Sequence, residues 1–463
     1  MRRQTSRRDF LMNTTLAGVG FWVAGKSLLA KSKSPNEKLN IGIIGAGGKG
    51  LSDMEAVEKS DNIVALCDVD EKQAAKAREK QPQAKFYHDY RKLLEEEKSL
   101  DAVIVATPDH THAPASLLAM KLGKHVYCQK PLTHDVYEAR QMREAAAKYK
   151  VATQMGNQGS AESGLREAVE VIQSGALGPV HEVHVWSNRP IWPQGLDRPS
   201  NEYGPCNSPI PSTLKWDLWL GTALRRPYVD DAYCPFKWRG WWDFVTGALG
   251  DMACHTANMP FRALKLEYPT SIEAESSGPT AESPPKWSII RFEFPARGSL
   301  PPVKLTWYDG GKKPSEEVTK GLKLIDFRGG RKRKKPEKIE EGQTIPVSGC
   351  LVVGKEGMLF SPDDYGSKYF LFPEEKYGDF KPPAPSIPRS PGHYVEWIQA
   401  IKGGPPAYSN FDFAALLTET ILLGNLAVRV GKRIEWDGPN MKSTNCPEAM
   451  KFVRREYSPG YSV

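Results

Sequence analysis

The stretch Leu39-Asn-Ile-Gly-Ile-Ile-Gly-Ala-Gly-Gly-Lys-Gly50 decides the fold of this chain. A short apolar strand runs directly into the pattern Gly45-x-Gly47-x-x-Gly50, and a helical pattern follows. In such a turn the first glycine permits the bend, the second lets the backbone approach a pyrophosphate, and the third lets the helix pack close to the strand. Unpaired N–H groups at the helix start then face the phosphates. The predicted dinucleotide contacts here are Gly45, Ala46, Gly47, Gly48, Lys49 and Gly50.

A carboxylate follows the second predicted strand. The apolar run Asn62-Ile-Val-Ala-Leu-Cys67 ends at Asp68. An acidic side chain about 20 residues after the glycines binds a ribose 2′-hydroxyl. A glycine-rich turn or a solvated aspartate would explain either signal alone, but the strands, the glycines and the aspartate occur in the order that a dinucleotide site requires. The charge of Asp68 would repel a 2′-phosphate, and no arginine follows immediately, so NAD is favoured over NADP.

Strand and helix patterns alternate along residues 38–160. The predicted helices are 71–80, 114–122 and 135–148, and the later strands are 102–107, 125–128 and 151–154. Such alternation with short links predicts an α/β Rossmann domain with a parallel, doubly wound sheet. Ligands of these sheets bind beyond the carboxyl ends of the strands. The candidates at those ends are Asp68, Thr107, Pro108, Gln129, Lys130, Pro131 and Asn157.

The pattern changes from about Val180. Strand-like runs at 180–187, 288–294, 303–308, 322–327 and 351–359 have little helix between them. They predict an α+β domain over residues 161–440 with a large, mostly antiparallel open sheet. A short helix is expected at 214–220 and longer ones at 393–402 and 411–430, before a C-terminal tail at 441–463.

Residues 1–30 are predicted to lie outside the fold. Ser6-Arg7-Arg8-Asp9-Phe10-Leu11 is a twin-arginine motif, and the apolar stretch after it is short and broken by glycines. We interpret the segment as a Tat signal, which exports proteins that are already folded, and expect a periplasmic protein that meets the Tat machinery. Leu28-Leu29-Ala30 matches an A-x-A cleavage site poorly. An uncleaved N-terminal anchor therefore stays open, and no other stable membrane span is expected.

Composition and charge are those of an ordinary globular protein. The 463 residues are 40% hydrophobic and 25% charged, which suits two domains. Of the net charge of +8, residues 1–30 supply five Lys or Arg against one Asp, so +4 remains without them. That charge is too small to argue for nucleic acid, and the basic run 328–338 lacks a helical or aromatic pattern. We therefore expect no nucleic-acid partner.

The seven cysteines are scattered and form no CxxC pair. Cys67 and Cys128 end apolar strands and are predicted to be buried thiols, whereas Cys206 and Cys234 could pair in an oxidising compartment. No set of metal ligands stands in an obvious motif, so no metal site is predicted.

Two segments could carry chemistry. Lys130 follows a strand, where a cation can polarise a carbonyl or stabilise an alkoxide; a surface lysine before a proline is the plainer alternative. Asp251 and His255 are spaced i,i+4 and share one face of a predicted helix. His255 can act as a general base near neutral pH, with Asp251 orienting it or binding a second hydroxyl. A structural Asp–His contact and half of a metal site are the alternatives.

These motifs occur in an order that resembles the Gfo/Idh/MocA oxidoreductases. The segments that carry the resemblance are Gly45-x-Gly47-x-x-Gly50, Ala106-Thr-Pro-Asp-His-Thr-His112, Gln129-Lys130-Pro131 and Asp251-x-x-x-His255. The similarity covers roughly Leu39 to Asp437. Trp238-Arg-Gly-Trp-Trp-Asp243 and Gly247-Ala-Leu-Gly-Asp-Met252 are similar to the exported, twin-arginine branch of that family.

The resemblance implies NAD(P)-dependent oxidation of a sugar or cyclitol hydroxyl by a Rossmann domain joined to an open-sheet domain. It matches Lys130 to the catalytic lysine and Asp251 and His255 to the acid–base pair, and it adds His110 and His112 to the expected cofactor contacts. It also implies a homo-oligomer that associates through the open sheet. In the expected reaction, His255 accepts the hydroxyl proton, Lys130 stabilises the alkoxide and Asp251 positions His255 while a hydride passes to the nicotinamide.

The chain departs from the family pattern at one position. Members usually carry Glu-Lys-Pro where this chain has Gln129-Lys130-Pro131. Without that negative charge Lys130 would hold its proton less firmly if the two side chains interact directly.

The tryptophans predict a carbohydrate substrate. Seven of the twelve fall within residues 186–242. Sugar C–H faces stack on aromatic rings, while flanking polar groups hold hydroxyls; Trp216 and Trp219 are instead expected to pack a short helix into the core. The expected substrate contacts are Asn188, Arg189, Trp238, Arg239, Trp241, Trp242 and Asp243.

Three functions fit this sequence. The first is a sugar, glycoside or cyclitol dehydrogenase, and the second is a glycosidase that oxidises its substrate transiently, eliminates the aglycone and reduces the product. The third is a sugar-binding protein with structural NAD. The periplasm offers no ready supply of NAD, so an exported enzyme is expected to carry NAD loaded before export, and exchange of hydride between two sugars would fit such retention. Asp251-x-x-x-His255 favours the dehydrogenase, and its conjunction with Lys130 argues against the non-catalytic protein.

Overall fold

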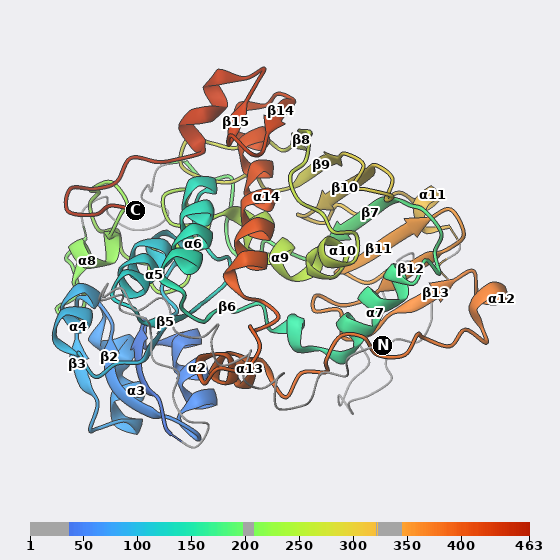
Figure 1. Ribbon diagram of the computed structural model, residues 1–463. Helices are drawn as coiled ribbons and strands as arrows, with labels where there is room; N and C mark the ends of the chain where they lie inside the picture. Colours follow the sequence, from blue (N-terminus) through green and yellow to red (C-terminus); the bar gives the residue numbers. More distant parts are fainter. Residues whose placement is uncertain (1–36, 198–207, 321, 323–344) are drawn as a thin grey trace, which may run out of the picture.

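The computed structural model of this chain describes residues 37–197, 208–320, 322 and 345–463 (Figure 1). The twin-arginine segment, the basic run 328–338, Cys206 and all but the first residue of the predicted strand 322–327 lie outside the described residues.

The N-terminal domain is built on a parallel sheet of six strands in the order β3-β2-β1-β4-β5-β6. The strands are β1 (Asn40–Ile44), β2 (Asn62–Cys67), β3 (Lys85–Tyr87), β4 (Ala102–Val105), β5 (His125–Cys128) and β6 (Thr153–Met155). The strand order reverses between β1 and β4, so the switch point at which ligands bind lies at the carboxyl ends of these two strands. The predicted doubly wound sheet is confirmed.

Helices cover both faces of this sheet. They are α2 (Gly48–Val57), α3 (Glu71–Lys80), α4 (Tyr90–Glu96), α5 (His112–Lys121) and α6 (Val136–Tyr149), with a 3₁₀ turn η1 (Asp109–Thr111) before α5. Ile43 of β1 packs in one apolar cluster with α2 and α3, while its neighbour Ile44 packs in a second cluster with α5 and α6. This alternation follows from the two-residue period of a strand that is buried on both faces.

The second domain is built on a nine-stranded sheet in the order β13-β12-β11-β7-β10-β9-β8-β14-β15. Its strands are β7 (Val180–Trp186), β8 (Ser271–Ser276), β9 (Ser288–Phe294), β10 (Val303–Tyr308), β11 (Gly349–Gly354), β12 (Met358–Ser361), β13 (Phe370–Phe372), β14 (Ile434–Asp437) and β15 (Lys442–Ser443). Among the described strands of this second sheet, only β7 and β10 pair in parallel, so the prediction of a mostly antiparallel sheet is confirmed. The single strand predicted at 351–359 is wrong, because the chain turns at 355–357 and forms the hairpin of β11 and β12.

The described helices of this domain are η2 (Gln158–Ala161), α7 (Ser163–Gln173), α8 (Trp216–Leu220), η4 (Lys237–Gly240), α9 (Gly247–Thr256), α10 (Asn258–Ala263), α11 (Glu316–Thr319), α12 (Glu374–Tyr377), α13 (His393–Ile401), α14 (Phe411–Val430) and η5 (Pro447–Phe452). Some of them, such as α9 and α14, lie between the sheet and the N-terminal domain, whereas α11 and α12 lie at the far end of the sheet (Figure 1).

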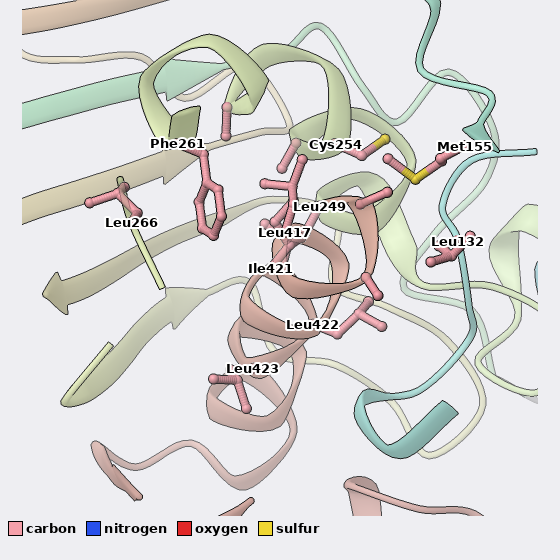
Figure 2. Close-up of a cluster of buried hydrophobic side chains, with 14 of the residues drawn as sticks. Leu132, Met155, Leu249, Cys254, Phe261, Leu266, Leu417, Ile421, Leu422 and Leu423 are labelled. Atoms are coloured by element: carbon pink, nitrogen blue, oxygen red, sulfur yellow. The ribbon is translucent and has the colours of Figure 1, made fainter. Parts of the chain in front are cut away.

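Helix α14 joins the two domains through the core. Figure 2 shows Leu417, Ile421 and Leu422 of α14 in one cluster with Leu249 and Cys254 of α9. On another side α14 contacts α6, and Glu419 pairs with Arg140 there at 2.6 Å. Among the described helices α14 is the one long and apolar enough to cross a membrane, but it is largely buried, as is typical of a core helix. Its packing fixes α9 against the Rossmann domain.

Residues 441–463, predicted as a tail, pack against both domains. β15 extends the second sheet, and Arg455 reaches the loop that follows β4. There its guanidinium donates to the carbonyl of His110 at 2.6 Å, to Thr222 Oγ1 at 2.7 Å and to Glu138 Oε1 at 3.1 Å.

Candidate active site

A cavity of about 680 Å³ lies at the carboxyl edge of the parallel sheet and reaches across to α9. Its volume is in the usual range for a small-molecule or cofactor site. Of the predicted site residues, its walls contain Gly45, Gly47, Gly48, Lys49, Asp68, Thr107, Pro108, Gln129, Lys130, Arg189, Trp238, Arg239, Asp251 and His255. The glycine turn and the Lys130 region are therefore parts of one cavity.

The glycine turn has the close packing that the motif predicts. Gly45 has φ +85°, and a Cβ there would lie 2.7 Å from the carbonyl of Ala106. A Cβ on Gly50 would lie 1.7 Å from the carbonyl oxygen of Gly45, so only glycine lets α2 start this close to β1. α2 has no side-chain N-cap, unlike α3, α4 and α6, which leaves N–H groups of its first turn unpaired by side chains.

Asp68 stands beside this turn. Its Oδ2 accepts the N–H of Gly47 and its Oδ1 accepts the N–H of Asp70, each at 3.0 Å. Burial raises the pKa of Asp68 to about 6, although the backbone N–H groups oppose the shift. A carboxylate therefore remains in the cavity wall at neutral pH.

These features fit a dinucleotide. A Cβ on Gly48 would meet nothing within 4 Å, so the turn is open toward a ligand. Uncapped N–H groups at the start of a helix bind phosphates, and a carboxylate after the second strand binds ribose hydroxyls. The residues that would hold NAD are accordingly the turn at Gly45–Lys49 and Asp68.

Two predicted cofactor contacts, His110 and His112, do not line the cavity. Both imidazoles are buried. His110 Nε2 lies 3.0 Å from the carbonyl of Trp219, and the ring of His112 lies between the carbonyls of Pro131 and Thr107, at 2.8 and 2.7 Å. His112 therefore fastens the loop after β4 to the loop after β5, a structural role that the motif alone does not reveal.

Ala46, Gly50 and Asn157 do not line the cavity either. Ala46 is buried, Gly50 packs on Gly45, and Asn157 Nδ2 donates to the carbonyl of Cys254 in α9 at 3.2 Å. These three residues therefore pack around the site and do not face the space that a cofactor would occupy.

Lys130 and Asp251 meet at the other end of the cavity. Lys130 Nζ lies 2.7 Å from Asp251 Oδ1 and donates also to the Asp251 carbonyl at 3.0 Å. Burial opposes the charge on both groups, but their mutual attraction prevails: the pKa of Lys130 lies above its usual value, and the pKa of Asp251 lies below. Both side chains are therefore charged over the physiological pH range.

His255 follows one turn later on α9 and faces the same cavity. Burial and the nearby Lys130 hold its pKa well below 6.5, so the imidazole is neutral. Its Nδ1 is buried with no partner among the described residues. The expected orienting contact is wrong: Asp251 bonds to Lys130, and no hydrogen bond joins Asp251 to His255 in the described part of the chain. The ring of Tyr365 packs edge-on against His255, with centroids 5.0 Å apart.

Gln129 does not contact the Lys130 ammonium. Its Nε2 donates to Asp53 Oδ2 at 2.8 Å, on the side of the loop that faces α2. The expected weakening of the proton on Lys130 therefore does not arise, because the side chain at position 129 pairs with a different carboxylate.

Only part of the predicted substrate set lines the cavity. Arg189, Trp238 and Arg239 do. Trp241 is buried and donates to the carbonyl of Ala232, and Trp242 is buried beside Arg429. Asp243 pairs with Arg226, and Asn188 is exposed. Trp216 and Trp219 stack with centroids 4.9 Å apart in the core, as predicted, and Trp219 also reaches the cavity wall.

Sequence reasoning missed Asp109 and Tyr365. Asp109 lines the cavity, and its Oδ2 accepts from Thr246 Oγ1 at 3.0 Å. Burial raises its pKa to about 7, although Arg239 opposes the shift. The sequence could have pointed to Asp109, because it directly follows Thr107 and Pro108, which were predicted from their place after a strand. Tyr365 comes from the loop after β12 and carries no local signal.

No group of three or more His, Cys, Asp or Glu side chains within the described residues is arranged to hold a metal ion. The described cysteines are free thiols, and Cys67 and Cys128 are buried as predicted.

The fold and the cavity define the class of protein: an oxidoreductase with an NAD-binding Rossmann domain. Residues 39–157 match the family model described as oxidoreductase family, NAD-binding Rossmann fold, and residues 170–297 match its C-terminal alpha/beta domain. The chain belongs to the Gfo/Idh/MocA oxidoreductase family.

Individual relatives are distant. A myo-inositol 2-dehydrogenase of Thermotoga maritima is 29% identical over 157 residues, 34% of this chain and 47% of that protein. A glycosyl hydrolase family 109 protein of Solibacter usitatus is 34% identical over 154 residues, 29% of this chain and 35% of that protein. The matches thus span less than half of these relatives. The WlbA dehydrogenase of Bordetella pertussis, solved with NADH and UDP-GlcNAcA, shares the fold with a TM-score of 0.57 and 15% identity, covering 87% of this chain and 99% of that one.

Proposed function

We propose that this chain is an NAD-dependent dehydrogenase that oxidises a hydroxyl of a sugar, glycoside or cyclitol. The observation that carries the proposal is the convergence of Lys130, Asp251 and His255 at one end of a cavity whose other end carries a dinucleotide turn. Similarity to inositol dehydrogenases supports the substrate class.

Each of the three side chains has a charge state suited to one role. When bound, the nicotinamide supplies a hydride acceptor. His255 is neutral and takes the hydroxyl proton; because its Nδ1 is sealed in the protein, Nε2 is the atom that meets the substrate. The Lys130 ammonium stabilises the charge that develops on the oxygen. Asp251 holds that ammonium in place and protonated.

A second candidate is a glycosidase that uses NAD transiently. The similarity to a glycosyl hydrolase family 109 protein favours it, and the same three residues would serve its oxidation step. A sugar-binding protein with structural NAD is a third candidate. The charged pair of Lys130 and Asp251 and the neutral His255 argue against it, because a protein that only binds sugar does not need them.

One purification and one screen separate these candidates. The purified protein is denatured and its supernatant assayed for NAD, and the native protein is offered inositols, sugars and nitrophenyl glycosides. Net formation of reduced nicotinamide supports the dehydrogenase. Release of nitrophenol without net reduction supports the glycosidase, and saturable sugar binding with neither signal supports the binding protein.

We also propose export by the Tat machinery with NAD tightly held, on the strength of Ser6-Arg7-Arg8. Replacing both arginines by lysine should leave the protein in the cytoplasmic fraction, still containing NAD. Association of copies through the open sheet is proposed from family analogy, and light scattering of the eluting protein measures it.

A further inference from the structure

Arg239 is a cation in the wall of the cavity whose charge acts on Asp109 and Asp251 without a direct bond to either carboxyl. Its guanidinium has no hydrogen bond and no ion pair among the described residues and is held by stacking instead. Its guanidinium lies 4.2 Å from the ring centroid of Trp238 and 4.9 Å from that of Phe236. Stacking occupies the faces of a guanidinium and leaves its N–H groups, which point outward in its plane, free to bind an anion.

Arg239 acts at the reacting end of the cavity. Its charge lowers the pKa of Asp109 and of Asp251 and opposes the protonation of Lys130. The shift at Asp68, at the dinucleotide end, instead arises from burial, from backbone N–H groups and from Asp70. An anion bound to Arg239 would therefore sit near the hydroxyl that reacts and away from the phosphates of a dinucleotide.

The balance of charge at this end also favours an anion. The described ionisable groups lining it include three cations, Lys130, Arg189 and Arg239, and two carboxyls, Asp109 and Asp251. Asp251 serves two of the cations, because its Oδ1 binds Lys130 at 2.7 Å and its Oδ2 lies 3.8 Å from Arg189 Nε. Burial raises the pKa of Asp109 to about 7, so that group is only partly ionised at neutral pH.

The short helix that carries Arg239 is firmly held. Trp238 is buried, and the following Trp241 is fully buried with its Nε1 donating to the carbonyl of Ala232 at 2.7 Å. A fixed guanidinium loses little freedom on binding, and planar oxyanions pair with it through two parallel hydrogen bonds.

We propose that the substrate carries an oxyanion, a carboxylate or a phosphate, which Arg239 binds with Arg189 beside it, so that the substrate is an acidic sugar and not a neutral cyclitol. The inference rests on the proposed function for the identity of the site. It adds the charge of the substrate, which that proposal leaves open.

The test is calorimetric titration of the NAD-saturated protein with three probes: glucuronate, glucose 6-phosphate and glucose. At least one anionic probe should bind about 10- to 100-fold more tightly than glucose, the range for charge-assisted hydrogen bonds. Tighter binding of glucuronate assigns a carboxylate, and tighter binding of the phosphate assigns a phosphoryl group.

Variants then assign the preference to Arg239. Arg239→Gln should remove it, and Arg239→Lys should restore only part, because lysine keeps the charge but lacks the planar fork. Lys237→Gln is the matched control: it lies on the same short helix, pairs with Asp231 and does not line the cavity. If Arg239→Gln does not fold, the titrations are repeated with the unaltered protein at several salt concentrations. Rising ionic strength should weaken the binding of the anionic probes and leave the binding of glucose unchanged.

The outcomes separate this inference from the proposed function. Equal binding of all three probes overturns the inference, as does an anionic preference that survives Arg239→Gln. Reduction of NAD by a neutral sugar with an unchanged KM in Arg239→Gln also overturns it while the proposed function stands. Arg239-dependent binding of an anionic sugar without any redox turnover supports the inference and contradicts the proposed function.

Discussion

The Lys130 ammonium and the Asp251 carboxylate, 121 positions apart in the chain, lie 2.7 Å from each other and join the loop after β5 to α9. Asp251 is what keeps the pKa of the buried Lys130 above its usual value. In Asp251→Asn the attraction of the carboxylate is lost, and burial together with the charge of Arg239 lowers the pKa of Lys130. The alkaline limb of kcat/KM should therefore move to lower pH in this variant. An alkaline limb that stays where it is would mean that Lys130 does not set it.

Replacing Lys130 or His255 should lower the turnover number and leave the affinity for NAD nearly unchanged. Lys130→Met and His255→Gln should each lower kcat by about 10²- to 10⁴-fold, the usual range for general acid–base groups. NAD affinity should stay within a few-fold, since the dinucleotide turn is at the opposite end of the cavity. Fluorescence titration with NAD and initial rates measure the two effects separately. Near-normal turnover in both variants would remove these residues from the proposed mechanism.

The partner of Gln129 explains why glutamine is favoured at this position. Its amide donates to buried Asp53, which also accepts from Tyr394 at 2.5 Å. Gln129→Glu would set two carboxylates against each other and should lower the free energy of unfolding by about 1–3 kcal/mol. Adding Asp53→Asn should recover part of that loss, because the amide can then donate to the new carboxylate. Urea unfolding of the two variants measures the coupling, and equal stability of single and double variants would contradict it.

Asp109 should make stability depend on pH. The pKa of Asp109 is about 7 in the folded protein against a usual 3.8, so ionisation of this group disfavours the folded state. The stability that the protonated carboxyl provides is therefore lost as pH rises from about 4 to 7. Asp109→Asn cannot ionise and can still accept from Thr246. The variant should gain up to about 4 kcal/mol over the unaltered protein across that interval. Thermal unfolding at several pH values measures the gain, and exposed Asp379→Asn should show none.

The choice between NAD and NADP should weaken in acid. The pKa of Asp68 is raised to about 6 by burial, so below that value the group loses the charge that excludes a 2′-phosphate. The ratio of NAD to NADP affinity should fall as pH drops from 7 to 5, and Asp68→Asn should show a low ratio at every pH. A ratio in the unaltered protein that does not change with pH would assign the discrimination to other residues.

Much of the fold was predictable because it depends on local pattern. Gly45 to Asp68 supplies two strands, a turn and a helix within one stretch, and the two-residue and 3.6-residue periods are short enough to read directly. The hairpin of β11 and β12 was missed because both strands are short and Lys355-Glu356 is only a brief polar break between two apolar runs.

The site was less predictable because its contacts cross domains. The spacing of Asp251 and His255 correctly places both on one face of α9, yet it cannot show that Lys130 competes for the carboxylate. His112 and Trp241 were predicted to contact a ligand because of their side-chain chemistry. Both instead hydrogen-bond to backbone carbonyls and hold loops together, which the sequence does not reveal. Asp109 could have been found, as it follows a strand end, whereas Tyr365 enters the site from the second sheet without any motif.

The position of Arg455 near the end of the chain determines when, during synthesis, the loop at His110 can form all of its contacts. Its guanidinium supplies donors to the carbonyl of His110, to Thr222 and to Glu138, groups made hundreds of residues earlier. A ribosome therefore releases the Rossmann segment well before the loop at His110 can acquire its last partner. The loop at His110 can therefore reach its final hydrogen-bonded structure only after residue 455 has been synthesised.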